Sequence, residues 1–104
     1  MLPDMFAALA NPARRTILDE LREGPRTAGD LTRLLRQSRS AASEHLAVLR
    51  EAGLVREERQ GRYRYYHLQA AGLAEVSGWL KHYEHYWAQR LDALADLLDE
   101  ENQP

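Results

Sequence analysis

The sequence of 104 residues contains no cysteine. Disulfides, thiolate metal sites and thiol redox switches are therefore excluded, and the composition fits a cytoplasmic location. There is no run of about 18 or more apolar residues, so we expect no membrane-spanning helix and no membrane partner. The N-terminal residues have no basic flank and do not resemble a signal peptide. These absences predict a small globular domain.

The net charge of −2 by itself argues against a nucleic-acid partner. The charges, however, are unevenly distributed. Eight arginines and four acidic residues lie between Arg33 and Arg64, whereas the segment 90–104 has one arginine and five acidic residues. A basic middle and an acidic end predict one electropositive face, and this face matters more for DNA binding than the total charge.

Capping residues and apolar spacing predict helices in the first half of the chain. A short helix follows Asp4, and Asn11 caps a second helix that starts with a proline and spans about 12–22. Thr27 begins a third helix, with Asp30 placed as in a capping box. The expected inner faces of these helices are Met5, Phe6, Leu9, Ala10, Ala13, Ile17, Leu18, Leu21, Leu31, Leu34 and Leu35.

A fourth helix is predicted over Arg39–Ala52, with Ser38 as its cap and Gly53 as a left-handed C-terminal residue. Its apolar stripe consists of Ala42, Leu46 and Leu49. The third and fourth helices, joined by a turn of about three residues, are typical of a helix-turn-helix unit, whose second helix enters the major groove of DNA. The polar candidates for DNA contact on this segment are Ser38, Arg39, Ser40, Ser43, Glu44 and His45.

A change to alternating residues predicts two strands, Leu54–Glu58 and Tyr63–Leu68, around a turn at 59–62. Aromatic residues, which strands favour, are concentrated in the second of these segments. The turn is basic, and such a tip can reach a phosphate or a narrowed minor groove. The candidates for DNA contact here are Arg59, Arg62 and Arg64.

A long helix is predicted from about Ala70 to Glu100, although Gly72 and Gly78 disfavour its first two turns. Its apolar face is larger than one small domain can cover, so we expect a homodimer, with intramolecular core as the alternative role of these residues. The interface candidates are Phe6, Trp79, Tyr83, Tyr86, Trp87, Leu91 and Leu94.

Three segments resemble the ArsR-type family of transcriptional repressors: 8–18 (ALANPARRTIL), 38–55 (SRSAASEHLAVLREAGLV) and 61–68 (GRYRYYHL). The resemblance implies a mostly α, winged helix-turn-helix fold with a small β-hairpin, in the order four helices, hairpin, long helix. It also implies one domain over 1–104, and a homodimer that represses transcription from an inverted-repeat operator. Arg64 departs from the family pattern, since that strand position is frequently apolar.

The resemblance also bears on the signal. Metal sensors of the family use cysteines in the third helix, or Asp and His ligands on the last helix. His82 and His85 have a spacing that can share zinc, but an Asp-x-His pattern earlier in the helix is missing. We therefore expect no metal or other cofactor. The sequence is most similar to cysteine-free autorepressors, which an inducer protein would release. A zinc- or nickel-responsive sensor is the alternative.

Other classes of function fit the sequence less well. The four histidines are spread over three predicted elements, and no serine, cysteine or carboxylate lies in a nucleophile motif, so we expect no enzyme. Ser43 and His45 lie two residues apart on a helix and point in different directions. A protein-interaction module that uses the long aromatic helix is a more remote alternative, because it would not need a basic hairpin.

Overall fold

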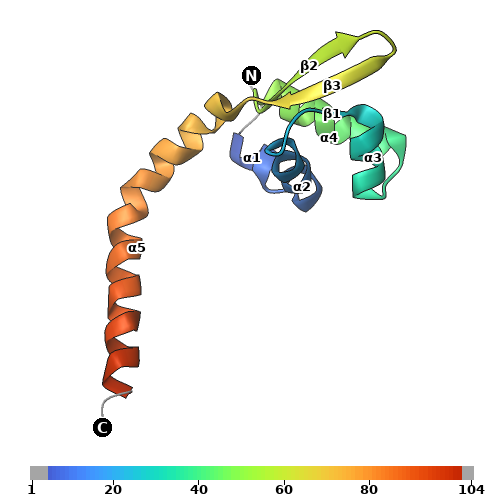
Figure 1. Cartoon of the computed structure of the whole chain (residues 1–104). Coiled ribbons are helices and arrows are strands. Elements are labelled where there is room, and N and C mark those ends of the chain that lie inside the picture. The colour runs from blue at the N-terminus through green and yellow to red at the C-terminus, as the bar shows by residue number, and fades with distance from the viewer. Residues whose placement is uncertain (1–4, 102–104) are drawn as a thin grey trace. The chain divides into compact units, whose positions relative to one another are not determined.

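The computed structural model describes residues 5–101, which form helices and one small antiparallel sheet (Figure 1). In chain order the elements are α1 (Met5–Leu9), α2 (Pro12–Leu21), β1 (Arg26–Thr27), α3 (Ala28–Leu35), α4 (Arg39–Glu51), β2 (Val55–Gln60), β3 (Tyr63–Leu68), the 3₁₀ turn η1 (Ala70–Leu73) and α5 (Ala74–Glu101). Contacts divide the chain into two compact units, one up to Ala74 and one from Glu75 onwards. The predicted order of elements is confirmed, and the proposed Asp4 cap lies outside the described residues.

The connection between α1 and α2 is held by side chains of the Asn-Pro-Ala-Arg-Arg segment. Asn11 caps α2 as predicted, because its Oδ1 accepts hydrogen bonds from the amides of Ala13 (2.8 Å) and Arg14 (3.2 Å). The guanidinium of Arg14 donates back to the carbonyl of Ala8 (2.8 Å), and that of Arg15 donates to Leu9 (2.9 Å). Carbonyls at the end of α1, which lack helical partners, are thereby satisfied.

The core of the first unit lies where α1–α4 meet the base of the sheet. Its buried apolar residues are Met5, Ala8, Ile17, Leu18, Leu21, Leu31, Ala42, Leu46, Leu49, Leu54, Val55 and Tyr66. Three predicted inner residues are wrong, since Phe6 is 37% and Leu34 is 41% exposed, and Ala10, which follows the end of α1, is exposed as well. In α1 the inward side carries Met5 and Ala8 instead. Leu34 borders an open hollow that is also lined by Glu20 and Arg26 rather than a packed element.

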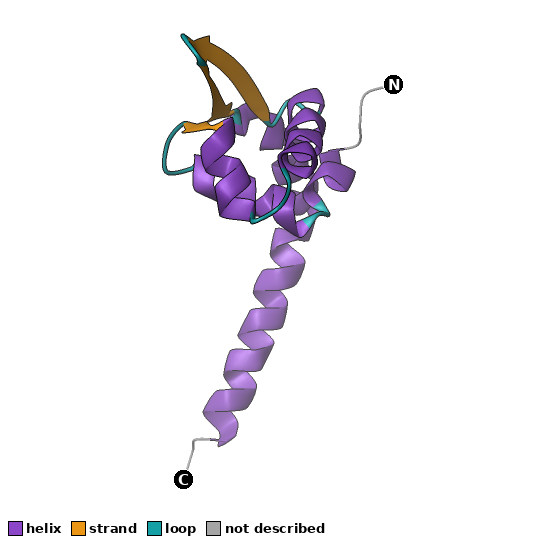
Figure 2. Ribbon diagram, turned by 90° about the vertical axis from the view of Figure 1, so that its right-hand side faces the viewer, coloured by secondary structure: helices purple, strands orange, loops and turns teal. Residues whose placement is uncertain are grey.

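The sheet has three strands in the order β1-β3-β2. The hairpin of β2 and β3 projects past the helices of its unit (Figure 2), and a two-residue turn with Gly61 at φ 61° closes it. The strand β2 is longer than predicted, because pairing continues to Gln60 opposite Tyr63. The strand β1 was not predicted, because two residues are too few to show the alternation of apolar and polar residues that is typical of a strand. It pairs Arg26 with Tyr66 and so ties the start of α3 to the hairpin.

The long C-terminal helix begins later than predicted. Residues 70–73 form the 3₁₀ turn η1, and the α-helix starts only at Ala74. Here the backbone runs against the turn after α4: the amide of Gln69 donates to the carbonyl of Leu54 (2.8 Å), and a Cβ on Gly72 would collide with the carbonyl of Gly53. Within residues 5–101, no helix combines the length and apolar character needed to cross a membrane.

We predict that Gly72→Ala lowers the free energy of unfolding by about 1–3 kcal/mol, because backbone rather than a flexible side chain must move to admit the methyl group. Gly78→Ala is the matched control, since a Cβ there meets nothing within 4 Å. Gly78 lies within α5, where alanine is favoured over glycine. The Gly78→Ala variant should therefore leave the free energy of unfolding unchanged or raise it by up to about 1 kcal/mol. Chemical denaturation of both variants checks this, and equal effects would contradict the close approach.

Candidate nucleic-acid interface

The helix-turn-helix pair is fixed at both helix starts by side-chain caps. Thr27 and Asp30 form the predicted capping box: Oγ1 of Thr27 accepts from the amide of Asp30 (3.1 Å), and the amide of Thr27 donates to Oδ2 of Asp30 (3.3 Å). Hydrogen bonds from Thr27 hold the pKa of the Asp30 carboxyl below its ordinary value. Ser38 caps α4, because its Oγ accepts from the amide of Ala41 (3.0 Å).

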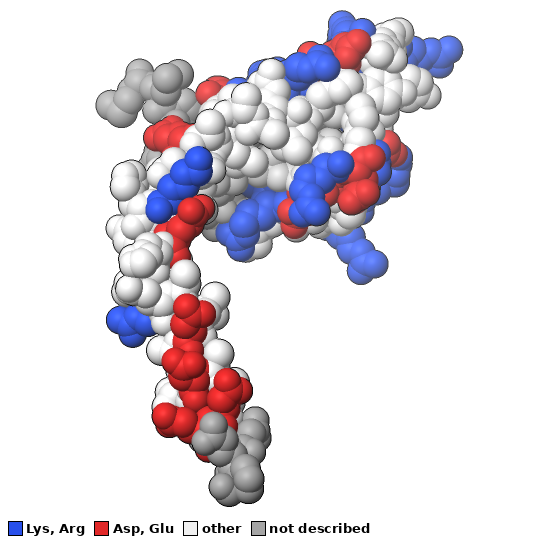
Figure 3. Space-filling view, turned by 60° about the vertical axis from the view of Figure 1, so that its left-hand side comes forward, with Lys and Arg blue, Asp and Glu red and all other residues white. Residues whose placement is uncertain are grey.

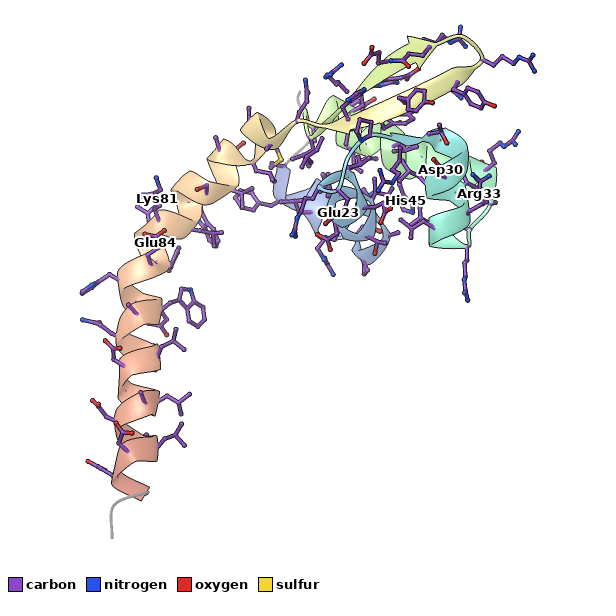
Figure 4. The ribbon with its side chains drawn as sticks, viewed as in Figure 1. Glu23, Asp30, Arg33, His45, Lys81 and Glu84 are labelled. Carbon is purple, nitrogen blue, oxygen red and sulfur yellow. The ribbon has the colours of Figure 1, made fainter. Side chains whose placement is uncertain are left out.

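α4 has a buried side and a polar side, as predicted. Ala42, Leu46 and Leu49 are at most 3% exposed and pack into the core. The opposite side begins at the N-terminus of the helix and consists of the exposed residues Ser38, Arg39, Ser40, Ser43 and Glu44. His45 differs from this group. It is half-buried, and its Nδ1 is enclosed with no hydrogen-bond partner in the described part of the chain (Figure 4).

The tip of the hairpin carries the three predicted arginines, Arg59, Arg62 and Arg64, and all are exposed. Arg59 and Arg64 lie directly opposite each other across β2 and β3. Like charges in such a pair destabilise a hairpin by themselves. None of the three has an ion-pair partner among residues 5–101. The tip is therefore an uncompensated cationic surface, which an anionic partner would stabilise.

Charges nearer the base of the hairpin, in contrast, are compensated. Arg50 of α4 pairs with Glu57 of β2 (2.8 Å), and Glu58 lies 2.9 Å from Nε2 of His67 and 3.5 Å from Arg56. A hydrogen bond from Gln60, and then the neighbouring His67 and Arg56, lower the pKa of Glu58. Unpaired positive charge is thus concentrated at the free end of the hairpin.

The basic tip and α4 border the same surface hollow. Arg39 and Ser43 of α4, Arg62 and Arg64 of the hairpin, and the first turns of α3 line it. The two groups of predicted DNA contacts are therefore brought together by the fold. Arg33 of α3 also lines this hollow and was not predicted. Its only signal in the sequence is its position three residues after Asp30, the acidic member of the capping box.

The predicted interface residues on α5 are exposed in this single chain, from 42% for Tyr83 to 62% for Leu91. Leu80, Leu97 and Leu98, which were not among the candidates, are exposed on the same helix. The acidic side chains gather toward the C-terminal half of α5 (Figure 3). This helix therefore presents a long apolar face and an acidic end.

The two histidines of α5 contact their own helix. Nδ1 of His82 lies 3.2 Å from the carbonyl oxygen of Trp79, and Nε2 of His85 lies 3.0 Å from Nε2 of Gln89. Across residues 5–101, no three His, Cys, Asp or Glu side chains cluster as metal ligands would. The geometry thus offers no particular support for the metal-sensor alternative.

Comparison with known proteins decides the family. The model of the family "Bacterial regulatory protein, arsR family" matches residues 11–57. The HTH-type transcriptional regulator Rv2034 of Mycobacterium tuberculosis is 40% identical over 96 residues, which cover 92% of this chain and 87% of that protein. The chain belongs to the ArsR family. The transcriptional repressor SdpR of Bacillus subtilis is 35% identical over 77 residues, covering 74% of this chain and 86% of that protein.

Solved structures agree with this assignment. An ArsR family transcriptional regulator is similar with a TM-score of 0.71 and 30% identity, covering 80% of this chain and 86% of the other. An ArsR-like transcriptional regulator from Rhodococcus sp. RHA1 is similar with a TM-score of 0.66 and 34% identity, and the match covers 88% of this chain and 87% of the other. This ArsR-family chain therefore has a winged helix-turn-helix fold, in which the β2–β3 hairpin is the wing. It is a DNA-binding transcriptional regulator and not an enzyme.

We predict that Thr27→Ala lowers the free energy of unfolding by about 0.5–2 kcal/mol, because the capping box at the start of α3 is lost. Hydrogen bonds with Thr27 hold the pKa of Asp30 in the folded protein below its ordinary value of 3.8. The Asp30 carboxylate therefore contributes fully to the free energy of unfolding at pH values above its ordinary pKa. This contribution is lost as the pH falls through the lowered pKa of the folded protein. The difference between wild type and variant should shrink in acid. Denaturation at several pH values measures it, and a pH-independent difference would contradict a role for the carboxylate.

Proposed function

We propose that this ArsR-family regulator is a homodimeric repressor that reads an inverted-repeat operator with the start of α4 and holds the DNA backbone with the wing. One observation carries the proposal. The exposed polar side of α4 and the uncompensated arginines of the wing border one hollow, so a single duplex can meet both. The negative net charge of the chain does not oppose this, since acidic residues gather at the other end of the sequence.

In this proposal the first turns of α4 enter the major groove. Arg39 is the residue suited to guanine, because a guanidinium can donate to O6 and N7 together. Ser40 and Ser43 can bond base edges or phosphates, and the carboxylate of Glu44 can accept from the amino group of cytosine. Ser38 lies at the cap and is suited to a phosphate. His45 is left out of the contact set, because its ring is half-buried and its Nδ1 is enclosed.

The wing contributes binding that does not depend on sequence. Arg59, Arg62 and Arg64 can neutralise phosphates or enter a narrowed minor groove. Binding of the DNA phosphate backbone would also relieve the repulsion between Arg59 and Arg64 across the hairpin. The wing thus supplies affinity and register, whereas α4 supplies the choice of bases.

We also propose that the apolar face of α5 joins two copies of the chain, so that residues 1–104 act as one DNA-binding and dimerisation domain. An isolated helix with this many exposed aromatic and leucine side chains would leave a large apolar surface in water. A two-fold dimer presents two recognition helices to half-sites about 10 base pairs apart. Phe6 of α1, 37% exposed, remains a candidate for the same interface.

For the signal, we propose a regulator without a bound metal or other cofactor, released by another protein. The chain has no thiolate, and His82 and His85 have contacts within their own helix. Soft metals and metalloids that require thiolate ligands therefore have no site here. Because the dimer would cover the apolar face of α5, the acidic end of this helix is the surface on which a protein inducer would act.

Selection of bound genomic fragments by the purified protein tests the function. We predict an enriched inverted repeat with half-sites about one helical turn apart. Arg39→Ala should relax base preference at one position of each half-site by about 1–3 kcal/mol. Arg62→Ala serves as the matched control, since it should weaken binding to every sequence equally and flatten the salt dependence. Enrichment of no sequence by wild type would refute the proposal, and uniform weakening by Arg39→Ala would assign Arg39 to phosphate alone.

We predict that Leu91→Glu converts the dimer to monomer, with at least about a tenfold loss of self-association, because a carboxylate would be placed in an apolar interface. Ala88→Glu adds the same charge to another side of the same helix and should leave the dimer intact. Sedimentation equilibrium measures both, with circular dichroism to check that α5 is still helical. Dissociation by both variants, or by neither, would contradict this assignment of the interface.

A further inference from the structure

The hollow between the helix-turn-helix pair and the wing has a chemistry of its own. Three parts of the chain meet around it: the first turns of α3, the polar side of α4 and the start of β3. Its lining residues are Thr27, Ala28, Gly29, Thr32, Arg33, Arg39, Ser43, Leu46, Arg62, Tyr63 and Arg64. Four of them are arginines, three carry aliphatic hydroxyls, and none is acidic. The lining is therefore suited to an anion.

Arg33 is held in place at this hollow. Its Nη2 lies 2.6 Å from Oδ1 of Asp30, whose other carboxylate oxygen accepts the amide of Thr27 (Figure 4). Its Nη1 lies only 3.5 Å from the place that a Cβ of Gly29 would occupy. Asp30 thus holds the guanidinium over the first turn of α3, where the helix end adds a partial positive charge. The Arg33 side chain is 74% exposed, so it remains free to meet a ligand.

The other three arginines of the hollow have no ion-pair partner within residues 5–101. Arg39 comes from α4, and Arg62 and Arg64 come from the wing. Four guanidiniums around one hollow repel each other, and within residues 5–101 the only ion pair that any of them forms is that of Arg33 with Asp30. A phosphate group would remove this repulsion and could accept from several guanidiniums together, which is the geometry that arginine forks favour.

We propose that this hollow binds one phosphodiester group of the operator backbone and that Arg33 is a further DNA contact there. The inference rests on the proposed function and deepens it. Arg39 borders both the hollow and the base-reading side of α4, so a duplex read by α4 brings its own backbone past the hollow. A phosphate held from α3, α4 and the wing together fixes the register of α4 in the groove.

Arg33→Gln tests the contact by DNA affinity measured over a range of salt concentrations. We expect a 3- to 10-fold loss on operator and on unrelated duplex alike, and a salt slope shallower by about 0.9 for each of the two subunits. Arg33→Lys keeps the charge and should retain the slope. Arg22→Gln is the matched control, because Arg22 is also exposed and lies three residues after an aspartate, Asp19, on α2. Unchanged affinity and slope for Arg33→Gln would overturn the inference.

A second measurement locates the phosphate. Neutral methylphosphonate linkages are placed one at a time along the operator, and wild type and Arg33→Gln are compared on each duplex. One linkage in each half-site should lower the DNA affinity of wild type strongly. The same linkage should lower the affinity of Arg33→Gln little, since the variant has already lost that contact. Equal losses for the two proteins at every linkage would overturn the assignment. Thermal unfolding checks that Arg33→Gln is folded, and its capping box does not depend on the arginine.

A small phosphorylated ligand has the same chemistry, and a third measurement separates the two sources. Inorganic phosphate and pyrophosphate are titrated into the DNA-free protein and followed by calorimetry. We expect no saturable binding, because a single small anion lacks the rest of the duplex. Saturable binding that Arg33→Gln abolishes would overturn the DNA assignment. If wild type binds no DNA, the proposed function fails. The proposed function stands if wild type binds DNA and Arg39→Ala and Arg62→Ala behave as proposed. If Arg33→Gln then leaves the affinity and the salt slope unchanged, only this inference fails.

Discussion

Burial of Ala42, Leu46 and Leu49 along one side of α4 turns the other side of that helix toward solvent. Every proposed contact with bases depends on this packing, because the buried side determines in which direction Arg39 and its neighbours point. The Ser38 cap sets where the helix begins, and the buried side sets its rotation. The core and the DNA-reading surface are therefore two sides of one element, and a change in either alters the other.

Electrostatics divides the chain in a way that its total charge conceals. Acidic and basic side chains compensate each other at the base of the wing, through Arg50–Glu57 and the groups around Glu58. The three arginines at the tip and Arg39 of α4 lack such partners among residues 5–101. Compensation where the wing meets the domain preserves the fold, and uncompensated charge at the free end provides long-range attraction for a polyanion. The repulsion between Arg59 and Arg64 is the local cost of this arrangement.

The ends of the helices could be predicted because their signals are local. Asn11, Thr27 and Ser38 cap α2, α3 and α4 with side chains that bond amides two or three residues away. Features set by distant residues were missed. The strand β1 exists because Arg26 and Thr27 pair with Tyr66 and Tyr65, which lie 40 and 38 positions later in the chain. The 3₁₀ turn η1 arises where Gly72 meets the carbonyl of Gly53. Burial of Leu34 was predicted from spacing, but within residues 5–101 its side chain stays 41% exposed and borders a hollow.

Local signals are enough to predict the family, the order of elements, the two sides of α4 and the basic tip, because caps, periodicity and charge are properties of neighbouring residues. Which of these features meet depends instead on how distant segments pack. The fold brings Arg33 of α3 beside Arg39, Arg62 and Arg64, and it leaves His45 half-buried with its Nδ1 enclosed. The reason is physical: a hollow is bounded by segments distant in the chain, and its lining is set by how their side chains pack rather than by their spacing.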